Sequence, residues 1–270
     1  METLYNLVKR TVEVYITPYS SHLRTAWFGF AITTFGILAS GTLTASYGRH
    51  YSKSSIIPSV NGKLGWMCME IVSPTTVLLF FQTYKLHGPY LSTGHVLLGL
   101  WLIHYINRAV LTVILSPGMK SSRLDIVFFS ISFNFIIAGW VGYDLALLNA
   151  ETFTFSLKTI VGLVMFIMGM AINTSSDYHL QSERRRKGGA GGQYILPEWG
   201  LYKYIVSPNY AGEIIEWTGY AIMLGRESVW SFVVWTICNL GPRAGSNLAW
   251  YKEKFGDKVG NRKGIIPGVI

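Results

Sequence analysis

The sequence predicts an all-α integral membrane protein with seven transmembrane helices, and three observations lead to this fold class. Half of its 270 residues are hydrophobic and only 14% are charged, whereas soluble domains carry about 25% charged residues. Apolar runs recur with about the 20 residues that a helix needs to cross the hydrocarbon core. Lysine and arginine gather in the segments between these runs, as expected for loops on the cytoplasmic face of a membrane.

Five apolar runs have the length of a spanning helix on their own. They are residues 24–46, 66–84, 95–115, 124–148 and 156–173. A sixth region, 212–240, is too long for one comfortable helix, and the tetrapeptide 225–228 interrupts its middle. This region fits either one tilted helix or two short helices that turn at the tetrapeptide.

Charge placement decides between these two arrangements. The segment 174–211 carries the basic run 184–187, and the C-terminal tail from Gly241 carries further lysine and arginine residues. Since the positive-inside rule places both segments on the cytoplasmic side, an even number of crossings must separate them, and the sixth region counts as two spans. The basic loops 47–65 and 116–123 fall on the same side. Seven spans then leave the N-terminus in the lumen and the C-terminus in the cytosol.

This topology divides the chain into three parts. Residues 1–23 form a lumenal N-terminal segment, residues 24–173 hold the first five spans and a substrate pocket, and residues 174–270 hold cytosolic loops that cap the pocket, the last two spans and a basic tail. The N-terminal sequence lacks the apolar core and the cleavage site of a signal peptide. The first span would therefore act as an uncleaved insertion signal, with the endoplasmic reticulum as the default membrane.

The net charge of +9 is interpreted as a signal of topology, because the basic residues lie between apolar runs. Cys68 and Cys238 lie in apolar surroundings and match no metal-ligand spacing. We therefore expect two buried free thiols, and neither a metal nor a nucleic acid as a partner.

Ionisable residues within a span are costly in lipid and usually mark function, and those of two spans stand out. Glu70 lies one turn into its span among apolar neighbours; it is either an interfacial carboxylate or a buried group. A buried carboxyl group favours its neutral form and can then donate a hydrogen bond. His104, Tyr105, Asn107 and Arg108 lie together in the middle of another span. Because Tyr105 and Arg108 are three residues apart, they share a helix face, and one pocket can contain both.

Further polar residues lie where spans meet the cytosol. Asn173 and Asp177, four residues apart, form either a polar helix exit or a hydrogen-bonding edge suited to a ribose or an amide. Glu213 and Glu216 either favour a helix N-terminus or have buried basic partners, which the segments 184–187 and 243–254 would supply. The predicted topology brings this polar set near the cytosolic surface and Tyr105 deeper, which indicates a pocket with a charged mouth and an apolar interior.

Several blocks of the chain together match the pattern of one family. They are 173–180, 200–207, 209–220, Arg243, Tyr251 and 262–267, preceded by Tyr47-Gly48-Arg49-His50-Tyr51, Glu70 with Pro74, and His104-Tyr105 with Arg108. In these blocks the sequence resembles the steroid 5α-reductase family over most of its length beyond residue 45. The block Gly-Glu-Ile-Ile-Glu-Trp at 212–217 is the most specific of them.

This resemblance implies a seven-helix membrane enzyme that uses NADPH to reduce the carbon–carbon double bond of an α,β-unsaturated ketone. Glu70 and Tyr105 match the family's catalytic carboxylate and tyrosine, which would hydrogen-bond the carbonyl oxygen as an oxyanion hole does. The positions that match cofactor contacts are Arg108, Asn173, Asp177, Arg184, Tyr194, Asn209, Glu213, Arg243, Asn247 and Tyr251. The implied partners are a lipophilic enone and membrane lipid, and a monomer is compatible with the pattern.

The chain differs from the family at a few positions, which widens the choice of substrate. Residues 244–247 read Ala-Gly-Ser-Asn where histidines are common, Met69 replaces a frequent glutamine, and Asn107 replaces a histidine. A steroid, a sterol, a terpenoid or another lipophilic enone would fit. The alternative functions are a trans-2-enoyl-CoA reductase, a membrane carboxyl methyltransferase that uses S-adenosylmethionine, and a seven-span transporter, although the chain shows no internal repeat of the kind transporters often have.

Overall fold

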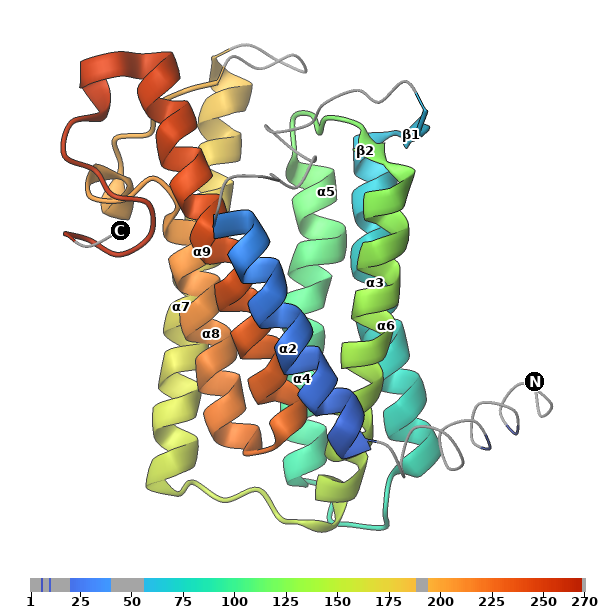
Figure 1. Cartoon of the computed structure of the whole chain (residues 1–270). Coiled ribbons are helices and arrows are strands. Elements are labelled where there is room, and N and C mark those ends of the chain that lie inside the picture. Colours follow the sequence, from blue (N-terminus) through green and yellow to red (C-terminus); the bar gives the residue numbers. More distant parts are fainter. Residues whose placement is uncertain (1–5, 7–9, 11–19, 40–55, 188–193, 269–270) are drawn as a thin grey trace.

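The computed structural model describes residues 6, 10, 20–39, 56–187 and 194–268, which form a bundle of long helices (Figure 1). The helices are α2 (Ser20–Ala39), α3 (Gly62–Tyr84), α4 (Thr93–Ile106), α5 (Thr112–Leu115), α6 (Leu124–Leu147), α7 (Leu157–Arg186), α8 (Pro208–Leu224) and α9 (Glu227–Phe255). A π-helical turn, η3 (Asn107–Leu111), joins α4 to α5 in one continuous rod. Short 3₁₀ turns are η4 (Leu148–Ala150), η6 (Gly200–Lys203) and η7 (Gly256–Val259).

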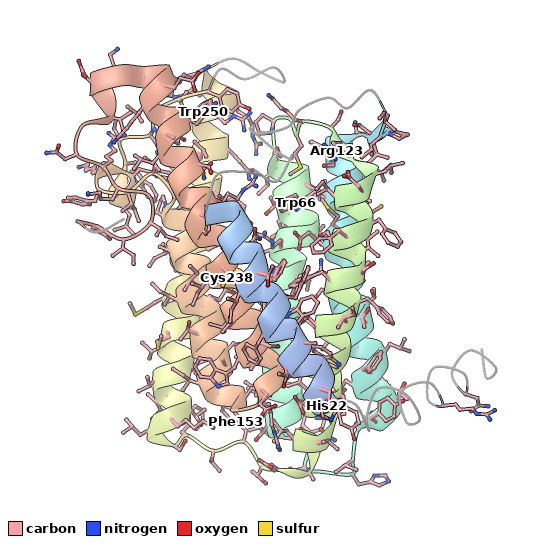
Figure 2. All side chains as sticks on the ribbon, viewed as in Figure 1. His22, Trp66, Arg123, Phe153, Cys238 and Trp250 are labelled. Carbon is pink, nitrogen blue, oxygen red and sulfur yellow. The ribbon has the colours of Figure 1, made fainter. Side chains whose placement is uncertain are left out.

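One end of the bundle is marked by a small β-bridge. Strand β1 (Ser59–Val60) pairs antiparallel with β2 (Ser122–Arg123), so the starts of α3 and α6 lie side by side. The C-terminal segment lies at the same end (Figure 1). Figure 2 shows Trp66 and Trp250 toward this end and Phe153 toward the opposite one. The end with β1 and β2 is the upper end of the bundle as drawn in Figure 1.

The predicted membrane character is supported by four of these rods. Among the described residues, Gly62–Tyr84, Thr93–Leu115, Leu124–Ala150 and Leu157–Arg186 have the length and hydropathy of membrane spans. Helices α2, α8 and α9 lie alongside them in the same bundle (Figure 1). The protein is therefore a helical membrane protein with four candidate spans, and the count of seven spans stays a prediction. Residues 40–46 of the first predicted span and the block Tyr47 to Tyr51 lie outside the described residues.

The region 212–240 forms two helices, as charge placement predicted. Helix α8 ends at Leu224, and Gly225 follows with φ +67° and ψ +28°. This left-handed conformation is readily adopted by glycine, which is why glycine so often terminates a helix. The Gly225 N–H donates to the carbonyl of Ala221 at 2.8 Å, and α9 begins two residues later at Glu227.

Two helices extend further than the apolar runs predicted. Helix α7 continues to Arg186 instead of ending near 173, because no glycine or proline interrupts the polar stretch before Gly188. At a rise of 1.5 Å per residue its 30 residues span about 45 Å, which exceeds the roughly 30 Å of the hydrocarbon core. Helix α9 continues through Pro242 to Phe255, where the sequence predicted a tail from Gly241. Membrane helices tolerate an internal proline when neighbouring groups satisfy the freed backbone.

Helices α7 and α8 approach each other closely because glycines line their contact. These glycines are Gly162 and Gly169 on α7, and Gly212 and Gly219 on α8. A Cβ atom on Gly169 would lie 2.3 Å from the backbone nitrogen of Glu216, and one on Gly212 would lie 2.5 Å from that of Asn173. Small residues of this kind let membrane helices pack backbone to backbone. This glycine-lined contact between α7 and α8, the glycine seam, brings Asn173 against the first turns of α8.

We expect Gly169→Ala to destabilise the protein, because the added methyl group meets backbone atoms that cannot move aside without shifting a helix. Overpacking of this kind costs about 1–3 kcal/mol, which corresponds to a fall of roughly 2–10 °C in the thermal midpoint. Gly99→Ala is the control, since a Cβ on Gly99 in α4 meets nothing within 4 Å. Equal midpoints for the two variants, measured in detergent without ligand, would contradict the close seam.

Candidate functional site

A cavity of about 260 Å³ opens between α3, the α4–η3 rod, α6, α8 and α9. Its lining residues are Trp66, Met69, Glu70, Tyr105, Arg108, Ile126, Phe129, Ser130, Phe133, Asn134, Glu213, Phe232, Trp235, Thr236, Asn239 and Leu240. Glu70, Tyr105, Arg108 and Glu213 form a polar group, while aromatic and aliphatic side chains make up most of the remaining wall. The cavity therefore brings together both residues that the sequence assigned to catalysis and two assigned to a cofactor.

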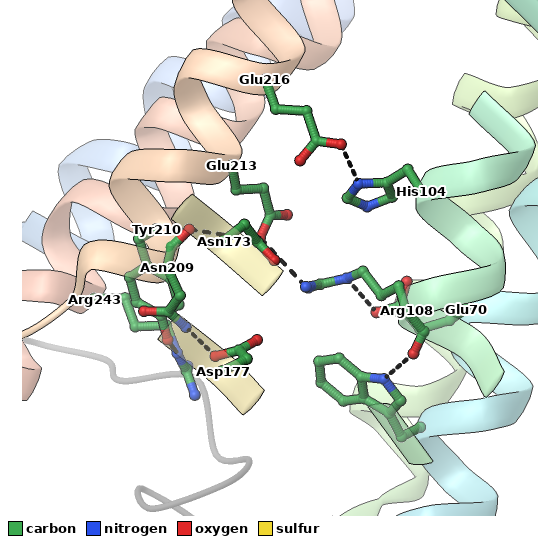
Figure 3. A network of polar contacts seen from close by, with 11 residues as sticks. Glu70, His104, Arg108, Asn173, Asp177, Asn209, Tyr210, Glu213, Glu216 and Arg243 are labelled. Carbon is green, nitrogen blue, oxygen red and sulfur yellow. Dashed lines mark hydrogen bonds and ion pairs between the residues drawn. The ribbon is translucent and has the colours of Figure 1, made fainter. Parts of the chain in front are cut away.

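Arg108 lies at the centre of the polar group, between two carboxylates from different helices (Figure 3). Its Nε donates to Oε1 of Glu70 at 3.2 Å, and its Nη1 donates to Oε2 of Glu213 at 3.3 Å. The guanidinium also lies over the ring of Trp66, 5.0 Å from the ring centre. One cation thus connects α3, the α4–η3 rod and α8.

The π-helical turn matters for this position. Arg108 is the second residue of η3, where the backbone is wound more widely than in α4. Such turns are rare and occur frequently at functional sites. The indole N–H of Trp66 donates to the backbone carbonyl of Arg108 at 3.2 Å, which ties this turn to α3.

From Glu213 a chain of hydrogen bonds continues along α7 and the start of α8 (Figure 3). The amide nitrogen of Asn173 donates to the same Glu213 oxygen that accepts from Arg108, at 3.3 Å, and to the carbonyl of Asn209 at 3.1 Å. The amide of Asn209 in turn donates to Asp177 at 3.0 Å. Because α7 runs on without a break, Asn173 and Asp177 lie one turn apart and face α8, the edge that their spacing predicted.

The remaining predicted residues from α9 lie near the start of α8 or beyond it. The Nε of Arg243 donates to the hydroxyl of Tyr210 at 3.0 Å, and the amide of Asn247 donates to that of Ser207 at 3.1 Å. Tyr251 is buried in a small core with Val206 and Val259. Arg243 and Asn247 therefore border the polar chain, whereas the position of Tyr251 is that of a core residue.

Arg184 and Tyr194 belong to a second cluster at the upper end. The guanidinium carbon of Arg184 lies 5.4 Å from the centre of the Tyr194 ring, the Nζ of Lys254 lies 5.2 Å from it, and the Nζ of Lys120 lies 5.9 Å from it. The Nε of Arg184 is buried and has no hydrogen-bond partner among the described residues. Within that part of the chain none of the three cations forms an ion pair. Three cations gathered around one ring offer charge-assisted hydrogen bonds to an anionic group.

Sequence reasoning missed Lys120 and Lys254, which it treated only as markers of topology. It sought the basic partners of Glu213 and Glu216 in the segments 184–187 and 243–254, and this was wrong. The structure pairs Glu213 with Arg108, and it pairs Glu216 with His104 by a contact of 2.7 Å between Nδ1 and Oε1. A helical spacing could have indicated this second pair. Glu216 follows Glu213 by three residues and His104 precedes Arg108 by four, so each lies on the same helix face as a partner in the charged centre.

Comparison with known proteins gives consistent matches. Residues 121–270 match the family described as 3-oxo-5-alpha-steroid 4-dehydrogenase. The chain is 34% identical over 256 residues to the steroid 5-alpha-reductase DET2 of Gossypium hirsutum, covering 89% of this chain and 96% of that protein. It is 34% identical over 232 residues to the 3-oxo-5-alpha-steroid 4-dehydrogenase 2 of Mus musculus, covering 84% and 88%. The 3-oxo-5-alpha-steroid 4-dehydrogenase 1 of Bos taurus is 31% identical over 232 residues, with 83% and 87% covered.

We expect Arg108→Ala to destabilise the bundle strongly, because it leaves Glu70 and Glu213 without their shared cation. Removing one partner of a buried charge pair costs about 3–5 kcal/mol. The measurement is the thermal midpoint in detergent, with Arg226→Ala as the control at an exposed position. Arg108→Lys keeps the charge without the forked geometry, so its midpoint should fall between the two. A midpoint for Arg108→Ala that equals the control would show that the two carboxylates do not depend on Arg108.

Proposed function

The chain belongs to the 3-oxo-5-alpha-steroid 4-dehydrogenase (steroid 5α-reductase) family of oxidoreductases that act on CH–CH groups, and we propose that it reduces the double bond of a lipophilic enone with NADPH. The observation that carries this proposal is the shared cavity, where Glu70 and Tyr105 stand beside Arg108 and Glu213 under a largely apolar wall. A steroid is the first candidate substrate, because the relatives are named for it. A sterol or a terpenoid has the same chemistry.

Charge balance supports a protonated Glu70. One guanidinium faces two carboxylates in a region of low dielectric, so an arrangement without net charge needs a proton on one of them. Glu213 accepts hydrogen bonds from both Arg108 and Asn173. Among the described residues, Glu70 accepts a hydrogen bond only from Arg108. Glu70 is therefore the better holder of the proton.

The proposed mechanism follows from these two donors. When bound, NADPH would supply the hydride that reduces the β-carbon of the enone. The Glu70 carboxyl and the Tyr105 hydroxyl donate hydrogen bonds to the carbonyl oxygen, where negative charge gathers as the β-carbon is reduced. One such donor in a preorganised site is worth about 10²–10³ in rate. A proton delivered to the α-carbon completes the reduction, so each turnover consumes one NADPH and one proton.

The residues above the cavity suit a nicotinamide cofactor that carries an extra phosphate. The amides of Asn173 and Asn209 and the carboxylate of Asp177 offer the donors and acceptors that ribose hydroxyls and a carboxamide need. The cations around Tyr194 would receive phosphate, and the buried Nε of Arg184 lacks an acceptor among the described residues. Arg108, Glu213, Arg243 and Asn247 would complete this site, with Tyr251 supporting it from the small core.

For the topology, we propose that all seven rods cross the membrane and that the upper end faces the cytosol. This end carries the basic residues of the α7 terminus and of the C-terminal segment, as the positive-inside rule requires. NADPH would enter from the cytosol and the enone from the lipid, in an endoplasmic reticulum membrane. The cavity lies within one chain, so a monomer would suffice. The names of the relatives favour this reading over the enoyl-CoA reductase, the methyltransferase and the transporter.

The decisive experiment follows NADPH absorbance in detergent with a panel of steroidal and terpenoid enones. We expect at least one enone to be reduced by the purified protein, and NADPH to raise its thermal midpoint through preferential binding to the folded state. If no enone consumes NADPH and the midpoint does not move, the proposed function is wrong.

Three variants divide the roles in the same assay. Glu70→Gln and Tyr105→Phe should lower turnover by about a hundredfold or more, since each removes a donor to the carbonyl oxygen, while NADPH still raises the midpoint. Asn209→Ala should instead weaken NADPH binding. Equal loss of NADPH binding in all three would contradict this division.

Cofactor choice is tested at the Tyr194 cluster. Lys254→Ala should weaken NADPH binding by about tenfold, or roughly 1.4 kcal/mol, and leave NADH binding unchanged, because only NADPH carries the extra phosphate. Lys252→Ala is the matched control, being an exposed lysine of the same helix without a contact to Tyr194. Kd values are measured by titration of tryptophan fluorescence. If the Kd values for NADPH and NADH rise equally, Lys254 contacts a group that both cofactors carry and does not select the extra phosphate.

A further inference from the structure

Three side-chain contacts join the α4–η3 rod to α8 at three successive levels. The hydroxyl of Tyr220 donates to the carbonyl of Leu97 at 3.0 Å. His104 then contacts Glu216 at 2.7 Å, and Arg108 contacts Glu213 at 3.3 Å. Spacings of three, four and seven residues keep all these side chains on one face of each helix. The result is an antiparallel ladder whose upper rung is the charged centre of the cavity.

The middle rung differs from the upper one, because it lies outside the cavity and is almost completely buried. His104 is 3% exposed and Glu216 is 1% exposed, and neither lines the cavity. The second oxygen of Glu216 has no hydrogen-bond partner in the described part of the chain. The imidazole is therefore the partner on which this carboxylate depends.

Such a pair is a poor source of net stability, since well-packed apolar side chains of similar volume serve as well or better. The location of the His104–Glu216 pair, next to Tyr105, indicates another role. The His104 ring lies edge-on to the Tyr105 ring with centres 5.0 Å apart, and it packs on Trp217 at 4.5 Å. Trp101 stacks on Tyr105 from another side at 5.4 Å. Trp101, His104 and Trp217 surround the Tyr105 ring. The pair fixes the position of two of them, because His104 is one member of the pair and Trp217 follows the other, Glu216, in the chain.

The backbone changes its helical winding next to Tyr105, so the orientation of this residue depends on contacts that hold the rod there. The π-helical turn begins at Asn107, two residues after Tyr105, and the Thr112 N–H donates to the carbonyl of Asn107, so the backbone winding widens at this point. His104 is anchored just before the turn and Arg108 within it. Together they would hold the rod on both sides of this change in winding.

We propose that His104 and Glu216 form a positioning pair that aims the Tyr105 hydroxyl at the carbonyl site of the cavity. The pair touches neither substrate nor cofactor. This inference rests on the proposed function, in which Tyr105 donates a hydrogen bond to the enone. A misplacement of about 1 Å at a reacting group can cost about a hundredfold in rate, so loss of the pair should appear in kcat.

Two double variants separate positioning from stability. His104→Leu/Glu216→Leu removes the imidazole, the carboxyl group and their directional contact, and leaves an apolar pair that should still fold. His104→Gln/Glu216→Gln also removes the imidazole and the carboxyl group but keeps a directional hydrogen bond between two amides. Tyr220→Phe is the control, because it breaks the lower rung of the same interface. The measurements are the thermal midpoint, the NADPH Kd, and kcat and KM for an enone that the wild type reduces.

We expect the Leu pair to retain the wild-type midpoint within a few degrees and a similar NADPH Kd, with kcat lowered about a hundredfold and KM nearly unchanged. The Gln pair should recover most of kcat. Tyr220→Phe should lower the midpoint and leave kcat unchanged. A Leu pair with normal kcat overturns the proposal, as does a Leu pair that does not fold or that loses NADPH affinity together with kcat. A wild type that reduces no enone refutes the proposed function itself and is recognised before any variant is compared.

Discussion

The charge of Arg108 is the interaction on which the arrangement of this protein depends. Glu70 and Glu213 reach the cavity from α3 and α8, and each would oppose burial if it faced the bundle alone. Charges and unpaired polar groups are costly in an apolar bundle, and Arg108 serves both: it neutralises one carboxylate and donates a hydrogen bond to each carboxyl group. The guanidinium meets this need because its planar fork offers several donors in fixed directions.

A second constraint acts through the backbone and not through charge. The glycine seam lets α7 approach α8 so closely that Asn173 reaches both the backbone of Asn209 and the side chain of Glu213. A bulkier seam would separate the helices and break the chain of hydrogen bonds that runs from the charged centre to Asp177. The seam and the guanidinium therefore support the same site from opposite sides of α8.

Much of this architecture could be predicted from the sequence, because the dominant signals are local. Apolar length marked the rods, the tetrapeptide at 225–228 marked the turn between α8 and α9, and a spacing of three residues placed Tyr105 and Arg108 together. Hydropathy measures compatibility with lipid and does not report where a helix ends. For this reason the polar extension of α7 beyond residue 173 was missed.

The features that escaped prediction depend on contacts between distant segments. Lys120, Arg184 and Lys254 meet at Tyr194 from three separate parts of the chain, and no local pattern pairs them. The π-helical turn at Asn107 has no clear sequence signature. The position of Tyr251 in a small core likewise depends on how the C-terminal segment folds back.

Because α7 is uninterrupted, it fixes the distance between the residues at its two polar sites. Asn173 and Arg184 are both on α7, and at 1.5 Å per residue the helix separates them by about 16 Å along its axis. On the proposed function, a ligand must bridge that distance to engage the hydrogen-bonding edge and the cation cluster at once. Mononucleotides would then gain only one anchor, whereas a dinucleotide would gain the second at high effective concentration. The protein would thus select its cofactor by length as well as by charge.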